Sequence, residues 1–262
     1  MNQSNLNREV LIQKIKTFRL LDDDFMSKVF EDDIECTEFL LHIIMGKPDL
    51  KVQEVRTQYS IRNLMGRSVR LDIHAIDEAK KKYNIEIQRA DKGAGAKRAR
   101  YNSSIIDANS LQTGTDFDEL PETYVIFITE NDVIGINEPI YHVDRIVKET
   151  GKPFGDEAHI VYVNGAYRDE SPIGLLMHDF SCTNPADMHY KILADKTRYF
   201  KENEKGVAAM CKVVEELCND AKIEEKRETA KRCLQLGKLS LEEIALCSGL
   251  SVEEIKELKE AQ

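Results

Sequence analysis

The spacing of apolar residues changes along the first half of the chain, and these changes predict most of its elements. Residues 24–45 carry apolar side chains at roughly helical spacing, which predicts one helix that ends at a glycine and a proline. Residues 50–61, 68–77 and 82–90 alternate as strands do, and a short charged turn joins the last two. These segments predict a helix followed by a three-stranded meander.

The following segments extend this pattern into a mixed sheet. Residues 92–112 have helical character, and residues 123–130 form a continuous apolar run that predicts a strand buried on both faces. Two further strands are predicted over residues 139–145 and 158–167, the second with an Asn-Gly turn signal. The order helix–strand–strand–strand–helix–strand predicts an α/β fold with helices flanking a mixed sheet.

The last part of the chain is mostly helical and strongly charged. We therefore expect an α/β domain over residues 1–180 and a helical region over residues 181–262. Near the end, Ala245, Gly249 and Ile255 have the spacing of a helix-turn-helix. The second helix would carry several glutamates, whose negative charges repel the phosphates of DNA. Two helices with a structural or partner-binding role are therefore favoured over a DNA-binding helix-turn-helix.

Composition narrows the class of protein. With 42% hydrophobic and 32% charged residues, the 262-residue chain can form a substantial core and is expected to be soluble. No apolar run approaches the ~20 residues that span a bilayer. The first residues lack the layout of a secretory signal, and the six cysteines show no C-x-x-C spacing and are expected to be reduced, mostly buried thiols. We therefore expect a cytoplasmic protein with no membrane association.

The net charge of −10 argues against a protein that coats nucleic acid, but the charge is spread unevenly. Residues 21–40 carry eight acids against one lysine, a local charge of −7. Residues 62–101 carry eleven Arg or Lys against five Asp or Glu, a local charge of +6. The positive block surrounds the second and third predicted strands, where nucleic acid could be bound locally.

Two acidic residues stand within these strands, although carboxylates are depleted from strands and costly to bury alone. Alternation places Asp72 on the face of His74, and it places Glu86 on the face of Asn84 and Gln88. If the strands are neighbours, the two carboxylates lie a few ångströms apart and repel each other unless a cation lies between them. Mg²⁺ or Mn²⁺ would suit such oxygen ligands, whereas a solvent-facing polar surface would need no cation.

The helix predicted next adds positive charge. Lys97, Arg98 and Arg100 follow Arg89 within a few residues. Acids that hold a metal ion, next to cations that hold phosphate, are typical of phosphodiester hydrolysis.

The pattern Asp-x(n)-Glu-x-Gln over two strands, followed by a helix bearing KRARY, resembles the PD-(D/E)XK nuclease superfamily. Within it, the chain is similar to the bacterial transposase family of recombination-promoting nucleases. The resemblance extends over most of residues 20–200 and is carried also by the segments DDDFMSKVF, GRSVRLDI, YNIEIQRA, LPETYVIFITENDVIG and MHDF.

The resemblance implies a restriction-endonuclease-like core and a DNA endonuclease that uses Mg²⁺ or Mn²⁺. Asp72 and Glu86 would hold the metal together with the carbonyl of Ile87. Gln88 stands where many members have a lysine, and since glutamine carries no charge it could only orient water or a phosphate oxygen. A cation from the next helix, Lys97 or Arg98, could replace that lysine.

The superfamily also uses a glutamate from its first helix. Glu31, Glu35 and Glu38 are the candidates, and Glu38 is assigned because it lies deepest in the predicted helix, although helical acids are often only solvated. The residues expected to contact nucleic acid are Arg89, Lys97, Arg98, Arg100 and Tyr101.

The histidines add weaker signals. His74 shares the face of Asp72, but a satisfied or exposed histidine is the favoured interpretation. His178 and His189 flank Cys182, and because zinc would need a fourth ligand and closer spacing, these residues are interpreted as structural.

Two classes of function therefore compete. The favoured hypothesis is an endonuclease acting on duplex DNA, since the chain has no Trp for stacking single-stranded bases. A homodimer with one site per strand would explain double-strand cleavage most simply. The alternative is an inactive nuclease fold that binds protein or nucleic acid. Metal binding separates the two, and RNA cleavage by the same chemistry stays open.

Overall fold

The computed structural model describes residues 3–61, 68–89 and 91–260. Its contacts divide the chain into two compact units, residues 1–207 and residues 208–262. The predicted division into an α/β domain over residues 1–180 and a helical region over residues 181–262 stays a prediction.

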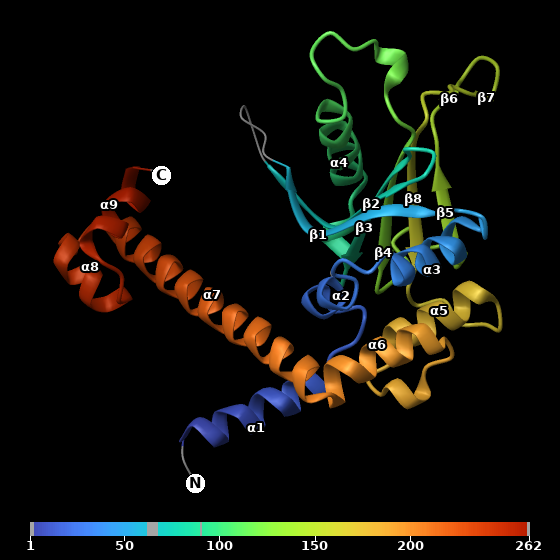
Figure 1. Cartoon of the computed structure of the whole chain (residues 1–262). Coiled ribbons are helices and arrows are strands. Elements are labelled where there is room, and N and C mark those ends of the chain that lie inside the picture. The colour runs from blue at the N-terminus through green and yellow to red at the C-terminus, as the bar shows by residue number, and fades with distance from the viewer. Residues whose placement is uncertain (1–2, 62–67, 90, 261–262) are drawn as a thin grey trace. The chain divides into compact units, whose positions relative to one another are not determined.

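The first unit contains a six-stranded sheet and the helices around it (Figure 1). Its helices are α1 (Gln3–Lys16), α2 (Asp23–Val29), α3 (Ile34–Met45), α4 (Ala96–Ala108), α5 (Pro172–Ser181) and α6 (Lys191–Glu202), with 3-10 turns at Asp91–Ala94, Phe117–Glu119 and Pro185–Asp187. Its strands are β1 (Val52–Ile61), β2 (Val69–Asp77), β3 (Lys82–Gln88), β4 (Thr123–Thr129), β5 (Ile140–Val143), β6 (Ile146–Val147), β7 (Lys152–Pro153) and β8 (Ala158–Asn164). Helices α1 and α5 and the small β6–β7 pair had no counterpart in the sequence-based prediction.

The strand order is β1-β2-β3-β4-β8-β5. Strands β1, β2 and β3 form the predicted antiparallel meander, and α4 then crosses over so that β4 lies parallel to β3. Strand β8 continues in parallel beside β4, and β5 is antiparallel to β8. The predicted order α3–β1–β2–β3–α4–β4 of an α/β fold with a mixed sheet is confirmed.

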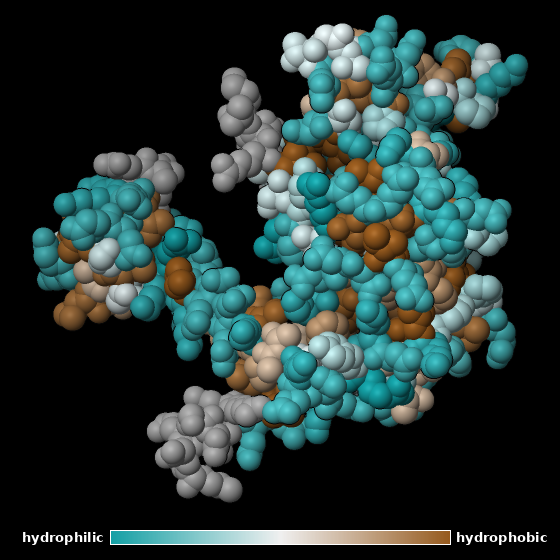
Figure 2. All heavy atoms as spheres, viewed as in Figure 1, coloured by the Kyte–Doolittle hydropathy of each residue, from teal (hydrophilic) through white to brown (hydrophobic). Residues whose placement is uncertain are grey.

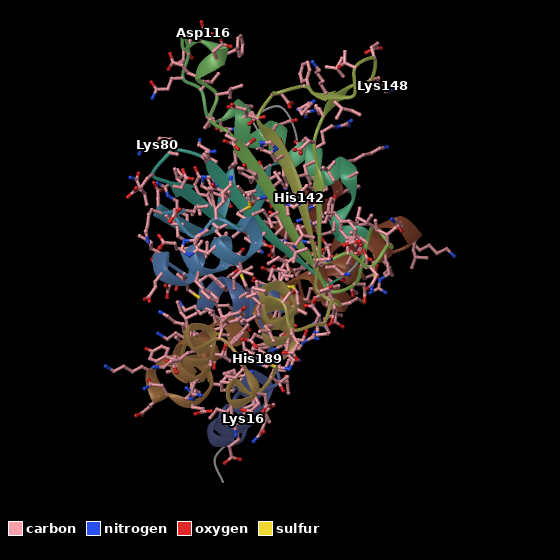
Figure 3. The ribbon with its side chains drawn as sticks, turned by 90° about the vertical axis from the view of Figure 1, so that its right-hand side faces the viewer. Lys16, Lys80, Asp116, His142, Lys148 and His189 are labelled. Atoms are coloured by element: carbon pink, nitrogen blue, oxygen red, sulfur yellow. The ribbon has the colours of Figure 1, made fainter. Side chains whose placement is uncertain are left out.

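Both faces of the central strand β4 are covered, and all seven of its residues are buried, as its continuous apolar run predicts. Val125 and Phe127 pack in one cluster with Ala99 of α4. Ile126 and Ile128, which alternate with them, are equally buried and point to the opposite face. Figures 1 and 3 show α4 on one side of the sheet and α3 on the other.

The single helix predicted over residues 24–45 is wrong, because the chain forms two helices, α2 and α3, in that range. Asp32 between them adopts φ 52°, a left-handed conformation that interrupts helical geometry. Asp33 then caps α3 by accepting a hydrogen bond from the amide of Cys36 at 2.9 Å. Apolar spacing continues across this break, so periodicity alone did not detect it.

The second unit contains the greater part of α7 (Glu204–Leu236), together with α8 (Leu241–Ser248) and α9 (Val252–Glu260). Gly249 ends α8 in a left-handed conformation, φ 69°, and Ile255 of α9 is fully buried. Ile255 packs with Ala230 of α7 and Ile244 of α8, and Ala245 lies against this cluster. The three residues of the helix-turn-helix spacing therefore do join two helices, and the choice between a structural pair and a DNA reader stays a prediction.

Two further expectations concern helices that could cross a membrane and the burial of the cysteine thiols. Helix α7 is largely hydrophilic on the side seen in Figure 2, and within the described residues no helix is both long and apolar enough to cross a bilayer. All six cysteines are free, but only Cys36 is buried, so the expectation of mostly buried thiols is wrong.

Candidate functional site

The two acidic residues within the meander lie on neighbouring strands. The antiparallel register pairs Ile73 of β2 with Ile85 of β3. Continuing this register by one residue places Asp72 opposite Glu86. Asp72 is 6% exposed and Glu86 is 0% exposed. The Asp72 Oδ2 atom accepts a hydrogen bond from the amide of Ile87 at 3.0 Å. The structure thus brings the predicted pair together, and it buries the pair instead of turning it to solvent.

Burial and mutual repulsion set the protonation of this pair. Burial raises the pKa of Asp72, and the charges of Glu86 and Asp23 raise that pKa further. Burial also raises the pKa of Glu86, against hydrogen bonds from Asn84 and Arg98. Both carboxyl groups therefore hold protons more tightly than a solvated acid does, unless positive charge enters the site.

A third acid, Asp23, lies near the pair and was not singled out from the sequence. It begins α2, which packs against β1 and β2. Its Oδ1 atom accepts from the Ser27 hydroxyl and from Gln58 Nε2, each at 3.3 Å. Its charge raises the pKa of both buried acids. The signal available in the sequence was the Asp-Asp-Asp run directly before the apolar start of a helix.

Glu38, the helical acid assigned from the resemblance, does not reach the pair. Its carboxylate accepts from Lys51 Nζ at 2.9 Å and from the amide of Val52 at 3.0 Å. Val52 is paired with Asp77, five residues along β2 from Asp72. These contacts hold Glu38 at the end of the meander remote from Asp72, and its assignment as the helical acid of the site stays a prediction.

The other two candidates from the first predicted helix also lie apart from the pair. Glu31 forms an ion pair with Lys28, and Glu35 is exposed in the first turn of α3.

Arg98 from α4 reaches into the acidic site. Its Nη2 atom donates to Glu86 Oε2 at 2.7 Å, and its Nη1 atom donates to Gln88 Oε1 at 3.1 Å. The same Nη1 atom donates to the carbonyl of Gly93, also at 3.1 Å. The guanidinium lies 5.9 Å from the centroid of the Phe127 ring. Positive charge is therefore present beside Gln88, supplied by the next helix as the sequence suggested.

Glu86 and Gln88 are held by further close contacts. Asn84 Nδ2 donates to Glu86 Oε1 at 3.1 Å, so each oxygen of this carboxylate has a partner. A Cβ atom at Gly93 would lie 1.8 Å from Gln88 Oε1, so glycine permits the close approach of the turn after β3.

His74 is also buried on β2, beside the acidic pair. Burial lowers its pKa to about 4, so the ring is neutral, and the ring stacks on Tyr59 at 5.3 Å between centroids. Within the described residues, neither His74 Nδ1 nor Asn84 Oδ1, paired in the strand register, has a hydrogen-bond partner. Neither a satisfied nor an exposed histidine describes this side chain.

The residues expected to contact nucleic acid fall into two groups. Lys97, Arg98 and Arg100 are exposed in the first turns of α4. Tyr101 is half-buried and packs against the apolar cluster under that helix.

Arg89 differs from Lys97 and Arg100 of α4 because two acids, Asp22 and Glu130, hold its guanidinium. Its Nη1 atom donates to Asp22 Oδ1 at 2.7 Å, and its Nε atom to Glu130 Oε2 at 3.4 Å. Arg19 also pairs with Glu130, at 2.8 Å. The network neutralises part of the positive charge predicted here.

The donor atoms gathered at this site fit a hard divalent cation. Asp72 and Glu86 are buried carboxylates whose charged forms need compensation, and the Asp23 carboxylate lies near enough to affect both. Carboxylate oxygens are the ligands that Mg²⁺ and Mn²⁺ prefer. Arg98 supplies part of the compensation through Glu86. The role of the Ile87 carbonyl as a metal ligand stays a prediction. The contact that the structure shows is made by the Ile87 amide, which donates to Asp72.

Comparison with known proteins gives one match. A family model described as PD-(D/E)XK nuclease family transposase matches residues 31–166, a little over half of the chain. The matched stretch runs from the residues before α3 to just beyond β8 and includes Asp72, Glu86, Gln88 and Arg98, whereas Asp23 precedes it. Neither curated proteins nor solved structures gave a match.

Proposed function

The chain belongs to the PD-(D/E)XK nuclease family transposases, and from this premise we propose that it is a metal-dependent endonuclease that hydrolyses phosphodiester bonds in DNA. The observation that carries the proposal is the burial of Asp72 and Glu86 side by side on β2 and β3, with Arg98 beside them. PD-(D/E)XK nucleases generally use divalent metal ions. Burying two adjacent carboxylates costs desolvation free energy, and a purely structural role gives no reason for that cost.

In this proposal, Asp72 and Glu86 hold Mg²⁺ or Mn²⁺, with the Ile87 carbonyl and Asp23 as further oxygen donors. A bound divalent ion lowers the pKa of water and stabilises negative charge on a phosphate. Asn84 orients the Glu86 carboxylate through Oε1. Gln88 then orients water or a phosphate oxygen by hydrogen bonding, because its amide carries no charge.

Arg98 takes the part that a lysine has in many members of the superfamily. Its guanidinium contacts both Glu86 and Gln88, and 42% of its side chain is exposed to a substrate. Arginine keeps its charge at all relevant pH values, so it can stabilise a phosphate but cannot donate a proton. Proton transfer to the leaving oxygen therefore falls to water.

DNA binding is proposed through the α4 cations. Lys97 and Arg100 are exposed in the first turns of that helix, on either side of Arg98 in the sequence. Backbone contacts of this kind position a duplex and depend strongly on salt, with little sequence preference. Cleavage of both strands would follow most simply from a homodimer with one site per strand. A role in recombination or transposition is proposed from the family description alone.

The second candidate is a binding module that has the nuclease fold without its activity. It is favoured by one observation: Arg98 already occupies an oxygen of Glu86, so the ion pair partly replaces a metal. This candidate predicts no binding of Mg²⁺ or Mn²⁺ at the acidic pair.

The deciding experiment measures cleavage and metal binding together. Purified full-length chain is incubated with supercoiled and linear duplex DNA, with an RNA duplex, and with Mg²⁺ or Mn²⁺. Asp72→Asn and Glu86→Gln are compared with Asp118→Asn, which changes an exposed acid. The endonuclease predicts DNA cleavage that EDTA abolishes and that each site variant lowers by about a hundredfold or more. No cleavage, combined with no metal binding by calorimetry, would select the binding module.

A further inference from the structure

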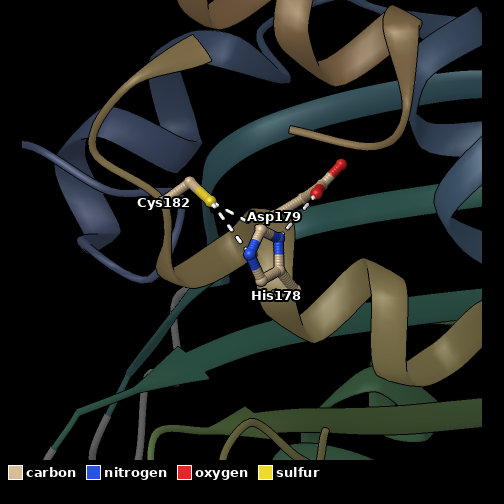
Figure 4. Close-up of side chains that lie close together, drawn as sticks. All are labelled: His178, Asp179 and Cys182. Carbon is tan, nitrogen blue, oxygen red and sulfur yellow. Dashed lines mark hydrogen bonds and ion pairs between the residues drawn. The ribbon is translucent and has the colours of Figure 1, made fainter. Parts of the chain in front are cut away.

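A second group of metal-binding side chains lies at the end of α5, outside the acidic site. His178, Asp179 and Cys182 each place a ligand atom within 4.8 Å of the others. The Cys182 Sγ atom lies 3.5 Å from His178 Nδ1 and 3.9 Å from His178 Nε2 (Figure 4). His178 Nδ1 lies 3.3 Å from Asp179 Oδ1.

The arrangement is fixed by backbone contacts from a different segment. Asp179 is fully buried and accepts hydrogen bonds from the amides of His189 and Tyr190, each at 2.8 Å. These contacts bring the start of α6 against the end of α5. They also place the His189 ring edge-on to the His178 ring, with 4.6 Å between centroids. In Figure 3 His189 is labelled in this part of the first unit.

The sequence argued against zinc here because a fourth ligand and closer spacing were missing. The structure places one ligand atom each of His178, Asp179 and Cys182 within 4.8 Å of the others, and His189 lies next to this group without being part of it. Asp179 adds a carboxylate that the sequence analysis did not count, and the segment after α5 folds back so that His189 stands beside His178. Imidazole nitrogen, thiolate sulfur and carboxylate oxygen are each ligands that zinc uses in proteins.

A cysteine beside a histidine also occurs in nucleophilic thiol sites, but the surroundings disfavour that role here. Burial and the carboxylates of Asp179 and Asp187 raise the pKa of the Cys182 thiol. A reactive cysteine needs the opposite environment, in which positive charge stabilises the thiolate. Neighbouring negative charge instead favours a bound cation.

We propose that His178, Asp179 and Cys182, with His189 as the fourth donor, form a Zn²⁺ site that ties α5 to the start of α6. Nitrogen and sulfur donors select a borderline-soft ion, whereas the oxygen donors around Asp72 select a hard one. The two sites are therefore expected to discriminate between metals. The role assigned to this zinc is structural, and it does not depend on the nuclease proposal.

The ligand set also predicts how binding proceeds. The side chain of His178 is 39% exposed, so an ion can enter from solvent. Coordination by Cys182 requires its thiolate, so one thiol proton passes to the buffer as Zn²⁺ binds.

The test uses the full-length chain after treatment with a chelator. Zn²⁺ binding is measured by competition with a chromophoric chelator, and Co²⁺ serves as a spectroscopic probe because a thiolate ligand gives a sulfur-to-cobalt charge-transfer band. We expect one tightly bound Zn²⁺, a higher Tm with Zn²⁺ than with Mg²⁺, and the charge-transfer band. Excess Mg²⁺ is not expected to displace the ion.

Cys182→Ser and His178→Asn are the site variants, and Cys218→Ser, an exposed cysteine in α7, is the matched control. Each site variant is expected to weaken Zn²⁺ binding about tenfold or more, and Cys182→Ser to remove the charge-transfer band. Circular dichroism checks that the variants fold, since both changed side chains are partly exposed. Binding that is absent, or equal in the control and both site variants, would overturn the proposal.

Discussion

Arg98 Nη2 donates to Glu86 Oε2 at 2.7 Å and so connects an exposed turn of α4 to a carboxylate that is fully buried on β3. The same guanidinium contacts Gln88, which stands where many superfamily members have a lysine. Two positions on consecutive elements, β3 and α4, are thus proposed to provide what one side chain provides elsewhere. From this relationship we predict that cleavage needs a positive charge at the site, whether β3 or α4 supplies it.

The first prediction concerns variants that move the positive charge from Arg98 on α4 to position 88 on β3. Arg98→Ala removes it and is expected to lower DNA cleavage by about a hundredfold or more, since a cation beside the phosphate is lost. Gln88→Lys in the Arg98→Ala background returns a cation from β3 and is expected to restore a large part of the cleavage rate. The rates are measured under single-turnover conditions, which isolate the chemical step from product release.

The single variant Gln88→Lys tests whether a second cation at the site adds to the effect of Arg98. With Arg98 present, a lysine at this position stands within reach of a second cation, so we expect no gain in rate. Lys97→Ala is the control for loss of charge on α4 without loss of the Glu86 contact. Equal rates for the double variant and Arg98→Ala would contradict the interchange of cations.

The second prediction concerns pH and follows from the raised pKa values of Asp72 and Glu86. Their ordinary values are 3.8 and 4.5, and both are higher in the folded protein. Above about pH 4 these two carboxyl groups therefore bind more protons in the folded state than in the unfolded chain. The free energy of unfolding of the metal-free protein should fall as pH rises through the raised pKa values, by at most about 1.4 kcal/mol per pH unit for each carboxyl.

Urea unfolding in EDTA between pH 5 and pH 8 measures this slope. Asp72→Asn should flatten the slope and stabilise the metal-free protein at neutral pH, because an amide has no charge to desolvate. Asp118→Asn, at an exposed acid, should leave the slope unchanged. A wild-type slope equal to that of Asp72→Asn would show that the pair is not strained by its charge.

Local patterns predicted the acidic pair because strand alternation and a short turn determine its geometry. Once β2 and β3 are neighbours, their register places Asp72 beside Glu86, because a shift by one residue would turn the apolar side chains away from the core. The buried strand β4 was predictable from its composition, since the apolar run Tyr-Val-Ile-Phe-Ile within it must be covered on both faces. The acidic pair depends on two strands that follow each other in the sequence, whereas the burial of β4 follows from the composition of the strand itself.

The parts that failed depend on how helices cross the sheet. Periodicity could not show that α3 takes Glu38 to Lys51, or that the separate short helix α2 takes Asp23 toward the buried acids. The break between these helices depends on the left-handed backbone of Asp32, which apolar spacing does not encode. A run of acids before a helix resembles solvated surface until the packing of that helix is known.

The third prediction compares these two helical acids. Asp23→Asn is expected to weaken Mn²⁺ binding and lower cleavage about tenfold or more, because a negative charge near the metal donors is lost. Glu38→Gln should leave both unchanged while lowering the free energy of unfolding by about 0.5–1.5 kcal/mol, since it weakens contacts to Lys51 and to the Val52 amide. Calorimetry and urea unfolding measure the two effects. The reverse outcome would return the helical acid to Glu38.

The fourth prediction compares two exposed cations of α4 with the acid-paired Arg89 in DNA binding. Lys97→Ala and Arg100→Ala remove exposed α4 charges and should each reduce the slope of log affinity against log salt by about 0.9. Arg89→Ala should change this slope less, because Asp22 and Glu130 already hold that guanidinium and removing it leaves their charges uncompensated. Duplex affinity is measured by fluorescence anisotropy over a range of salt in Ca²⁺, which replaces the catalytic ion. A larger effect at Arg89 than at Lys97 would place the duplex over the β3 end of the site instead of over α4.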